Sequence, residues 1–234
     1  MSEGAREESV VVRWLGHSCF HVRFNTDVGP LDVVTDPYRA GMGYPEISLR
    51  ADVVTVSHRH SDHDQLAGIE GDPLVLYGTT EDGDWTDFCE PVRVKGVEFR
   101  QVRTYHDSES GARRGKNACF VLQGNGLTLV HLGDLGHIPT EDTASQMMGP
   151  HLLFVPLGGY FTIGAKEAVR TVEVLDPRIV IPMHYKTRAI RDWPISGPDD
   201  FLSQMATVRH LREAELSPEA LPPKQETWVL DYGE

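Results

Sequence analysis

Short apolar runs separated by turn residues make up most of the chain. Four β-branched runs come early and five more strand-like runs follow, at 10–15, 19–24, 31–36, 51–57, 73–78, 92–106, 151–159, 178–185 and 227–232. Gly, Pro, Asn and Asp lie between these runs, which is typical of β-strands. Two further runs, 117–123 and 127–134, flank the dipeptide Asn125-Gly126, and this pattern predicts a β-hairpin.

Helical spacing is limited to a few stretches. The period of the apolar residues predicts helices over 61–69, 166–175 and 199–213. Pro182 lies inside the run 178–185, which places this strand at a sheet edge or the proline near the strand's end. Hairpins come first in each half of the chain and helices come later. The pattern therefore indicates a mixed, sheet-rich chain and not a regular βαβ repeat.

Length and composition fit one globular domain. The chain has 234 residues, of which 40% are hydrophobic and 24% are charged, as in ordinary globular proteins. We expect residues 1–9 to form a disordered tail and residues 10–234 to form a single domain. No run approaches the ~18 apolar residues of a membrane helix, and the acidic, polar start of the chain is unlike a secretory signal. These features favour a cytoplasmic protein without a membrane partner.

Charge and cysteine content exclude several classes of function. The formal net charge is −13, from 22 basic and 35 acidic residues. Nucleic-acid binding relies on basic groups that release counterions, so no nucleic-acid partner is expected. A small anionic substrate is still compatible, because net charge says little about one local site. Cys19, Cys89 and Cys119 are far apart, which argues against a disulfide framework and a thiolate zinc site.

The stretch SHRHSDHD at 57–64 carries the strongest chemical signal. It holds three histidines and two aspartates directly after an apolar run. Imidazole and carboxylate groups are ligands of divalent transition metals. In an extended segment His58 and His60 point the same way and could hold one ion. If the chain then turns, Asp62 and His63 move to a second position, so the spacing favours a pair of metals over a solvated polar loop.

Three residues further along the chain could complete such a pair of sites. His106, Asp134 and His184 each follow or close an apolar run. Taken alone, a histidine at a strand end is more often a surface or capping residue. Taken together, the three supply the missing ligands, including a carboxylate that could bridge both ions. Open sheets tend to place ligands at such strand ends.

The motifs resemble those of a known family. They are WLGHSCF at 14–20, TDP at 35–37, SHRHSDHD, YHD at 105–107, HLGD at 131–134, PLGGYFTIGAKEA at 156–168 and PMHY at 182–185. Together they are similar to the metallo-β-lactamase superfamily, in particular its ascorbate-6-phosphate-lactonase-like, Zn-dependent hydrolase branch. The resemblance covers about residues 10–190.

This resemblance implies an α+β fold, a four-layered αβ/βα sandwich of two mixed sheets with helices outside. It also implies that His58, His60 and His106 hold a first metal. Asp62, His63 and His184 would hold a second, and Asp134 would bridge the two. The expected cofactor is a pair of divalent ions, zinc in the first place, with manganese or iron and a single ion as alternatives.

The implied activity is hydrolysis by a metal-bound hydroxide. Two adjacent cations acidify a water molecule and polarise a carbonyl or phosphoryl oxygen. We expect a small ester, a lactone or a phosphorylated metabolite as substrate, with Asp62 able to hold the proton of the nucleophile. The alternatives are a phosphodiesterase or nuclease acting on nucleic acid, a non-catalytic metal-bound sensor and, more weakly, a di-iron redox protein. The redox branch carries an acidic residue where this chain has His60.

Several residues near the ligands could support them. Asp36, Asp64 and Asp107 could anchor the ligating imidazoles, or they could cap turns. His17 could orient substrate or protonate a leaving group, and a hydrogen-bonded structural histidine is the alternative. For His131 and His137 the structural role is favoured.

Basic and aromatic residues suggest where a substrate could bind. Arg113, Arg114 and Lys116 follow His106 within a Gly-flanked loop, and a second basic group follows His184, at Lys186, Arg188 and Arg191. Such clusters could clamp a phosphate or a carboxylate, and a solvated loop is the alternative. Candidates for apolar walls are Tyr160, Phe161 and Trp193. The patterns leave a homo-oligomer open.

Overall fold

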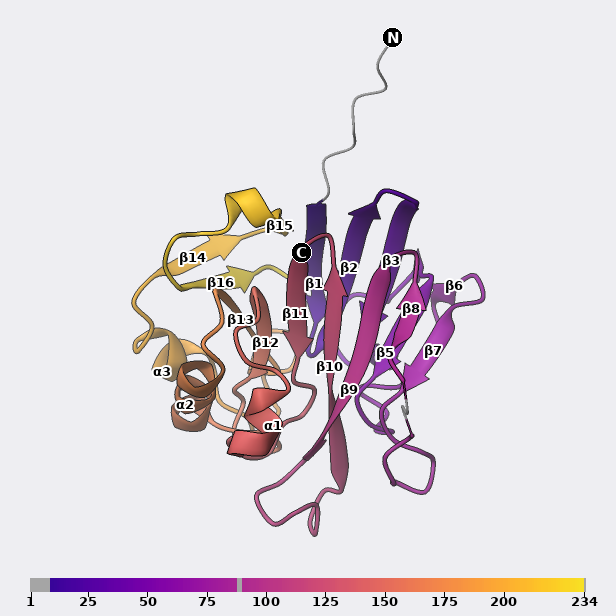
Figure 1. Cartoon of the computed structure of the whole chain (residues 1–234). Coiled ribbons are helices and arrows are strands. Elements are labelled where there is room, and N and C mark those ends of the chain that lie inside the picture. Colours follow the sequence, from indigo (N-terminus) through magenta and orange to yellow (C-terminus); the bar gives the residue numbers. More distant parts are fainter. Residues whose placement is uncertain (1–8, 88–89, 234) are drawn as a thin grey trace.

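Two β-sheets packed face to face form the centre of the computed structural model, which describes residues 9–87 and 90–233 (Figure 1). One sheet has the strand order β15-β1-β2-β3-β5-β7, spanning Ala214–Leu216, Ser9–Gly16, Cys19–Thr26, Gly29–Thr35, Val53–Val56 and Leu74–Tyr77. The other has the order β14-β16-β13-β12-β11-β10-β9-β8, spanning Val208–Leu211, Glu226–Leu230, Ile179–Met183, Leu152–Pro156, Leu127–His131, Lys116–Gly124, Val97–Tyr105 and Val92–Val94. A small separate pair consists of β4, Leu49–Arg50, and β6, Ile69–Glu70.

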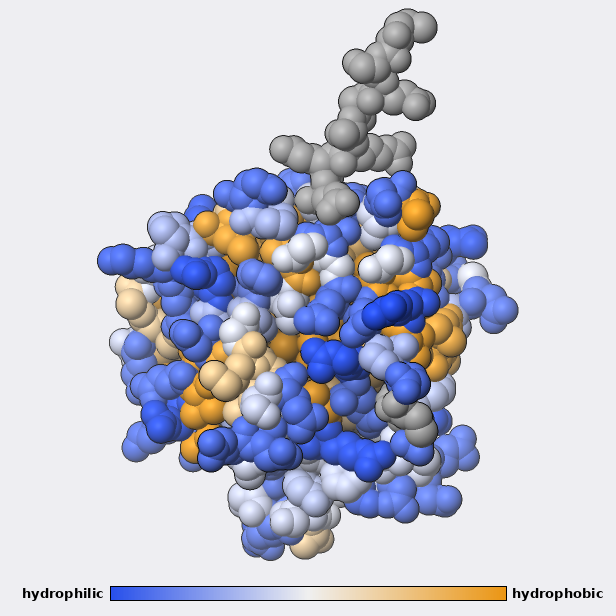
Figure 2. All heavy atoms as spheres, in the orientation of Figure 1, coloured by the Kyte–Doolittle hydropathy of each residue, from blue (hydrophilic) through white to orange (hydrophobic). Residues whose placement is uncertain are grey.

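The facing sides of the two sheets enclose one hydrophobic core. In β1 and β2 buried positions alternate with more exposed ones, so that Val12, Trp14, Phe20 and Val22 lie in the core. The parallel strands β12 and β13 are buried along their whole length, as expected for strands covered on both faces. Hydrophilic residues cover most of the face shown in Figure 2, with hydrophobic residues in separate patches between them.

Helices lie beside β12 and β13 of the eight-stranded sheet (Figure 1). They are α1, α2 and α3, at Glu141–Ser145, Ala165–Leu175 and Asp199–Leu202, with a 3₁₀ turn, η1, at Pro218–Ala220. α2 confirms the helix predicted over 166–175 and buries Ala168, Val172 and Leu175. These buried residues form the apolar stripe that the helical spacing in the sequence predicts.

Loops, and not helices, cover the outer side of the six-stranded sheet in the described part of the chain. Val34 and Val54 on that side pack in a second hydrophobic cluster with the loop residues Tyr38, Met42 and Ile190. The predicted sandwich of two mixed sheets is thus confirmed. On this side its outer layer is built from loop side chains where helices were expected.

Two of the predicted helices are wrong over most of their length. Residues 61–69 form turns that lead into β6. Gly68 has a φ of +93° and lies against the Ile47 carbonyl, a conformation that a helix cannot adopt. In the range 199–213, only Asp199–Leu202 is helical, and β14 pairs with β16 instead. Backbone pairing with the sheet edge outweighs the helical spacing of the apolar side chains there.

The predicted hairpin is confirmed by the register of β10 and β11, in which Gly124 pairs with Leu127. Asn125 and Gly126 have φ values of 51° and 67°, as a type I′ turn requires. Pro182 lies in β13, which is an interior strand, so the edge position is wrong. The alternative, a place near the strand's end, is correct, because β16 pairs with β13 only before Pro182 is reached.

The predicted tail at residues 1–9 lies outside the described residues except for Ser9. Ser9 is the first residue of β1 and pairs with Asn25 of β2. Cys89 also lies outside the described residues, whereas Cys19 and Cys119 are buried free thiols. Among the described helices, none has both the length and the apolar content needed to cross a bilayer.

The strand directions bring several chain segments to one edge of the sandwich. β1, β3 and β5 run in the same direction in one sheet, and β9, β11 and β13 do so in the other. The segments that follow these six strands carry His17, Asp36, His58, His106, Asp134 and His184. Carboxyl ends of parallel strands are where open sheets build their sites.

Candidate metal centre

The structure brings the seven predicted metal ligands together in two adjoining groups. The first contains His58, His60 and His106, whose ligand atoms all lie within 4.8 Å of one another. Their ring centroids are 4.4, 4.7 and 5.3 Å apart. His58 and His106 are buried, whereas His60 is exposed, so this group is open to solvent on the side of His60.

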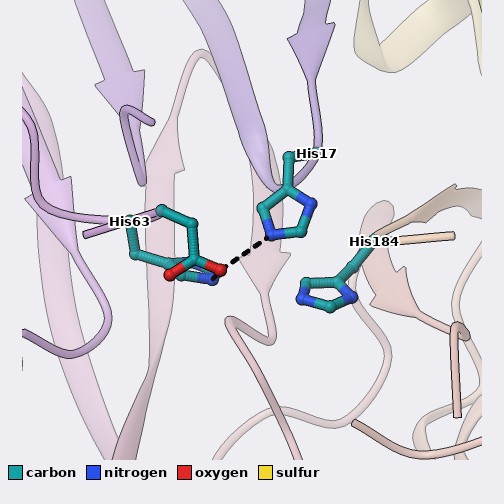
Figure 3. A group of neighbouring side chains, drawn as sticks. His17, His63 and His184 are labelled. Atoms are coloured by element: carbon teal, nitrogen blue, oxygen red, sulfur yellow. Dashed lines mark ion pairs between the residues drawn. The ribbon is translucent and has the colours of Figure 1, made fainter. Parts of the chain in front are cut away.

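The second group contains the predicted Asp62, His63 and His184, and it also contains His17. Figure 3 shows His17, His63 and His184 close together, with a dashed line from the His17 ring to a neighbouring carboxylate. This contact joins His17 Nε2 to Asp62 Oδ2 at 3.4 Å. The side chain of Asp62 is 24% exposed, whereas those of His17 and His63 are fully buried. Solvent therefore reaches this group beside Asp62.

Asp134 lies between the two groups. Its Oδ2 atom is 3.2 Å from His63 Nε2, 3.3 Å from both His106 Nε2 and His184 Nε2, and 3.9 Å from His58 Nε2. This carboxylate thus faces imidazoles of the first group and imidazoles of the second. That is the position that a bridging ligand requires.

The donor set fits divalent transition ions. Two donors that bind one ion at about 2.0–2.2 Å lie roughly 3–4 Å from each other, and the contacts of Asp134 at 3.2–3.3 Å agree with this. Asp134 Oδ1, His63 Nε2 and both ring nitrogens of His184 are buried without a hydrogen-bond partner among the described residues. Buried polar atoms are normally paired, and a bound cation would satisfy the carboxylate and one nitrogen of each imidazole ring.

Asp36 anchors ligands of both groups. Its Oδ2 accepts hydrogen bonds from His63 Nδ1 at 2.9 Å and from the Ser57 hydroxyl at 2.6 Å. The Ser57 hydroxyl also lies 2.9 Å from His58 Nδ1. Asp36 is fully buried and adopts a φ of 40°. It has the anchoring role predicted for it, because such partners fix the orientation of ligating rings.

The two other predicted anchoring aspartates do not contact ligating imidazoles. Asp64 Oδ2 accepts a hydrogen bond from Arg59 Nε at 2.6 Å. Asp107 accepts hydrogen bonds from four backbone N–H groups of its own loop, at Glu109, Gly111, Arg113 and Arg114. For Asp107 the alternative interpretation, capping of a turn, is therefore correct, and it organises the basic loop.

Two supporting residues were missed in the sequence. Ser57 links Asp36 to His58, and the buried Asn117 accepts a hydrogen bond from the backbone N–H of Asp134 at 2.9 Å. Asn117 stands at the start of the apolar strand β10, where a polar residue needs a partner. This polar residue within an apolar run is the feature of the sequence that could have identified Asn117. Nothing in the sequence marks Ser57 beyond its position before His58.

His131 and His137 have the structural roles favoured for them. His131 Nε2 lies 2.9 Å from the Ser18 carbonyl, and its Nδ1 accepts from the Gly133 N–H at 3.2 Å. His137 Nδ1 donates to the Ile138 carbonyl. Both rings are thus occupied by backbone groups.

Burial and charge set the protonation of the metal-free cluster. Burial lowers the pKa of His17 to about 3 and that of His106 to about 4, and it also lowers the pKa of His58. Burial acts in the same direction on His63, but Asp134 and Asp62 outweigh it and raise the pKa of His63 well above its usual value. Without metal, the His63 imidazole is thus held in its protonated form at neutral pH.

This pattern predicts that the metal-free protein loses stability as the pH falls from 7 to 5. His17, His58 and His106 have lower pKa values in the folded state than the unfolded value of 6.5. The unfolded chain therefore binds more protons in this range, and the free energy of unfolding decreases. His63 has the opposite effect. Because its pKa is raised in the folded state, its contribution to the free energy of unfolding is fully present below pH 6.5 and is lost as the pH rises through the folded pKa.

Because three histidines lower the stability and one opposes them, we expect the free energy of unfolding to fall by about 3–5 kcal/mol between pH 7 and pH 5. Urea unfolding of chelator-treated protein at the two pH values measures this. Asp62 and Asp134, whose pKa values are lowered, contribute only below about pH 4. Equal or greater stability at pH 5 would contradict the prediction.

The predicted basic residues differ in their surroundings. Arg113 pairs with Glu109 at 3.1 Å, and Lys116 pairs with Asp84 and lies over the Trp85 ring. Arg114 lies 5.7 Å above the ring centroid of Tyr160 and 5.5 Å above that of Phe161. Lys186 is partly buried, and its backbone N–H donates to the Ser196 carbonyl.

Known proteins are similar to this chain in both sequence and fold. Residues 11–184 match the family model described as the Beta-lactamase superfamily domain. The chain belongs to the metallo-β-lactamase superfamily. A relative from Thermococcus onnurineus, named UPF0173 metal-dependent hydrolase, is 33% identical over 213 residues, which cover 82% of this chain and 90% of the relative. The chain is accordingly a metal-dependent hydrolase of the metallo-β-lactamase superfamily.

Two solved structures have a similar overall fold. A metallo-β-lactamase superfamily protein from Thermotoga maritima is 31% identical, has a TM-score of 0.74, and the match covers 94% of this chain and 98% of that one. A metallo hydrolase from Ignicoccus hospitalis matches with a TM-score of 0.62 at 19% identity, and the match covers 97% of each chain. At this identity the match shows a similar fold and nothing more.

Proposed function

We propose that this metallo-β-lactamase-fold hydrolase uses two divalent ions to hydrolyse a small anionic ester, lactone or phosphorylated metabolite. The observation that carries the proposal is the position of Asp134 between two ligand groups. One group provides His58, His60 and His106, and the other provides Asp62, His63 and His184. Bound there, two ions would acidify a water molecule and polarise the oxygen of the bond to be cleaved.

Asp62 would orient the nucleophile. Burial raises its pKa, but the nearby imidazoles of His63 and His17 outweigh burial, and the pKa lies well below its usual range. The carboxylate is therefore ionised at neutral pH and accepts hydrogen bonds. Because it is the partly exposed acid of the second group, it can hold a water proton in place while one of its oxygens binds metal.

Arg114 and an aromatic wall would bind the substrate. The Trp193 ring lies 5.4 Å from the His17 ring and 6.0 Å from the Phe161 ring, and Tyr160 is 4.8 Å from Phe161. Arg114 lies over the far end of this row. No carboxylate lies within ion-pair distance of Arg114 among the described residues, whereas Arg113 and Lys116 are paired. A carboxylate or phosphate of the substrate could pair with its guanidinium.

We therefore expect Arg114→Ala to raise KM for an anionic substrate by about 10–100-fold, the loss of one hydrogen bond to a charged group. KM for a neutral ester of the same size should change much less. Arg113→Ala, in the same loop, is the matched control, since Arg113 already pairs with Glu109. Equal changes in KM for the anionic and the neutral substrate would rule out a pairing of Arg114 with the substrate's anionic group. Lys186→Ala tests the second basic cluster in the same way.

One experiment separates this proposal from the alternatives. Elemental analysis of purified protein should give two equivalents of zinc, manganese or iron, and a panel should show hydrolysis of small esters, lactones or phosphate esters. Activity confined to nucleic acid, with binding that weakens steeply with salt, would favour the nuclease alternative. Two bound ions without any hydrolysis in the panel would favour a sensor. The net charge of −13 argues against the nuclease.

A further inference from the structure

His17 fits the role of a metal ligand better than that of a substrate-orienting residue. Its ring is fully buried, and neither ring nitrogen has a hydrogen-bond partner among the described residues. An imidazole left in this state loses its hydration without compensation. Its Nε2 atom lies 3.4 Å from Asp62 Oδ2, within the roughly 3–4 Å that separates two donors on one ion.

The three histidines of the second group are arranged like those of the first. Centroid separations are 4.0 Å for His17 and His184, 5.2 Å for His17 and His63, and 5.9 Å for His63 and His184. In the first group the corresponding separations run from 4.4 to 5.3 Å. The second group therefore has the dimensions of a three-histidine cage.

The backbone holds His17 in place at some energetic cost. His17 and His184 both adopt positive φ values, 53° and 51°, which are uncommon for residues other than glycine and often mark functional positions. The N–H of His184 donates to the carbonyl of His17 at 3.1 Å, and the Trp14 indole donates to the same carbonyl at 3.0 Å. These bonds fix the turn between β1 and β2 against the loop after β13.

We propose that His17 is a direct ligand of the second metal ion, together with Asp62, His63, His184 and the bridging Asp134. This inference rests on the two-ion site proposed above. It gives the second ion five protein donors, whereas His58, His60, His106 and Asp134 give the first ion four. Of the two ions, the second is the more tightly held, and the first is the one that is lost first to a chelator.

Cobalt(II) binding to the full chain tests this assignment. Each imidazole bound to cobalt contributes an exchangeable N–H proton resonance shifted far outside the normal range. His17→Asn should remove one such resonance and weaken the tighter cobalt site by at least about 100-fold, above the cost usual for a residue that only supports a ligand. Asparagine tolerates the positive φ at this position, and thermal unfolding of the metal-free variant checks the fold.

The control is His21→Asn in the same hairpin. His21 lies outside both groups, and its Nε2 is bonded to Asp32 at 2.8 Å, so all shifted resonances and both affinities should be retained. If His17→Asn keeps every shifted resonance, His17 is not a ligand, whether or not the affinity falls through a positioning effect on Asp62. A wild-type protein that binds only one equivalent of cobalt would instead contradict the two-ion site itself.

Discussion

Replacing Asp134 with asparagine should leave less than one equivalent of metal on the purified protein and reduce kcat by about 1,000-fold or more, equivalent to at least about 4 kcal/mol. The Oδ2 atom of Asp134 lies within 3.2–3.9 Å of four imidazoles that belong to both ligand groups. Asparagine keeps the size of the side chain but removes its charge and one ligand oxygen. Both ions would lose their shared ligand at once.

The metal-free variant should differ as well. Asp134 contributes most to raising the pKa of His63, so Asp134→Asn should lower that pKa, which an NMR titration of the metal-free protein would follow. Asp32→Asn is a suitable control, because Asp32 also pairs with a histidine, His21, and neither residue belongs to a ligand group. An Asp134→Asn protein that retains two equivalents of metal and the wild-type rate would show that Asp134 is not the bridge.

The strongest part of the candidate site could be predicted from the sequence because of how sheets are built. His58, His106, Asp134 and His184 follow apolar runs, and parallel strands bring such ends to one edge. The same runs indicated a mixed, sheet-rich chain, and the superfamily resemblance implied that its strands form two packed mixed sheets. The superfamily resemblance added the assignment of ligands to ions, which the residue pattern alone had left open beyond His58, His60, Asp62 and His63.

What could not be predicted depends on contacts between distant segments. His17 joins the second group because a backbone bond ties its turn to His184, 167 residues away, and because both adopt a positive φ. Neither feature leaves a trace in local spacing. Asp107 looked like an anchor for His106 because it is adjacent in sequence, yet it accepts bonds from its own loop. The helix over 199–213 gave way to β14 because β16 offered an unpaired edge.

His60 allows the first ion to be removed without disturbing the core. It is exposed, in contrast to the buried His58 and His106. Its ring contacts both of these histidines, and its Nδ1 lies 3.0 Å from His58 Nε2. Substitution of an exposed residue usually changes stability by no more than about 0.5 kcal/mol. A loss of activity in such a variant can therefore be attributed to loss of the metal ion and not to unfolding.

We expect His60→Ala to bind one equivalent of metal in place of two and to lose at least about 100-fold in kcat, equivalent to about 3 kcal/mol. The metal-free variant should unfold at the wild-type temperature. His210→Ala is the matched control, since His210 is an exposed histidine on β14, outside both ligand groups.

The ion that remains in His60→Ala should be the one held by Asp62, His63 and His184, because the ligands of the second group are intact. Chelator competition would then show one tight site and no weak site. Loss of both ions would mean that the second ion depends on the first. Retention of two ions at wild-type affinity would exclude His60 as a ligand and would leave the first group with only His58, His106 and the shared carboxylate.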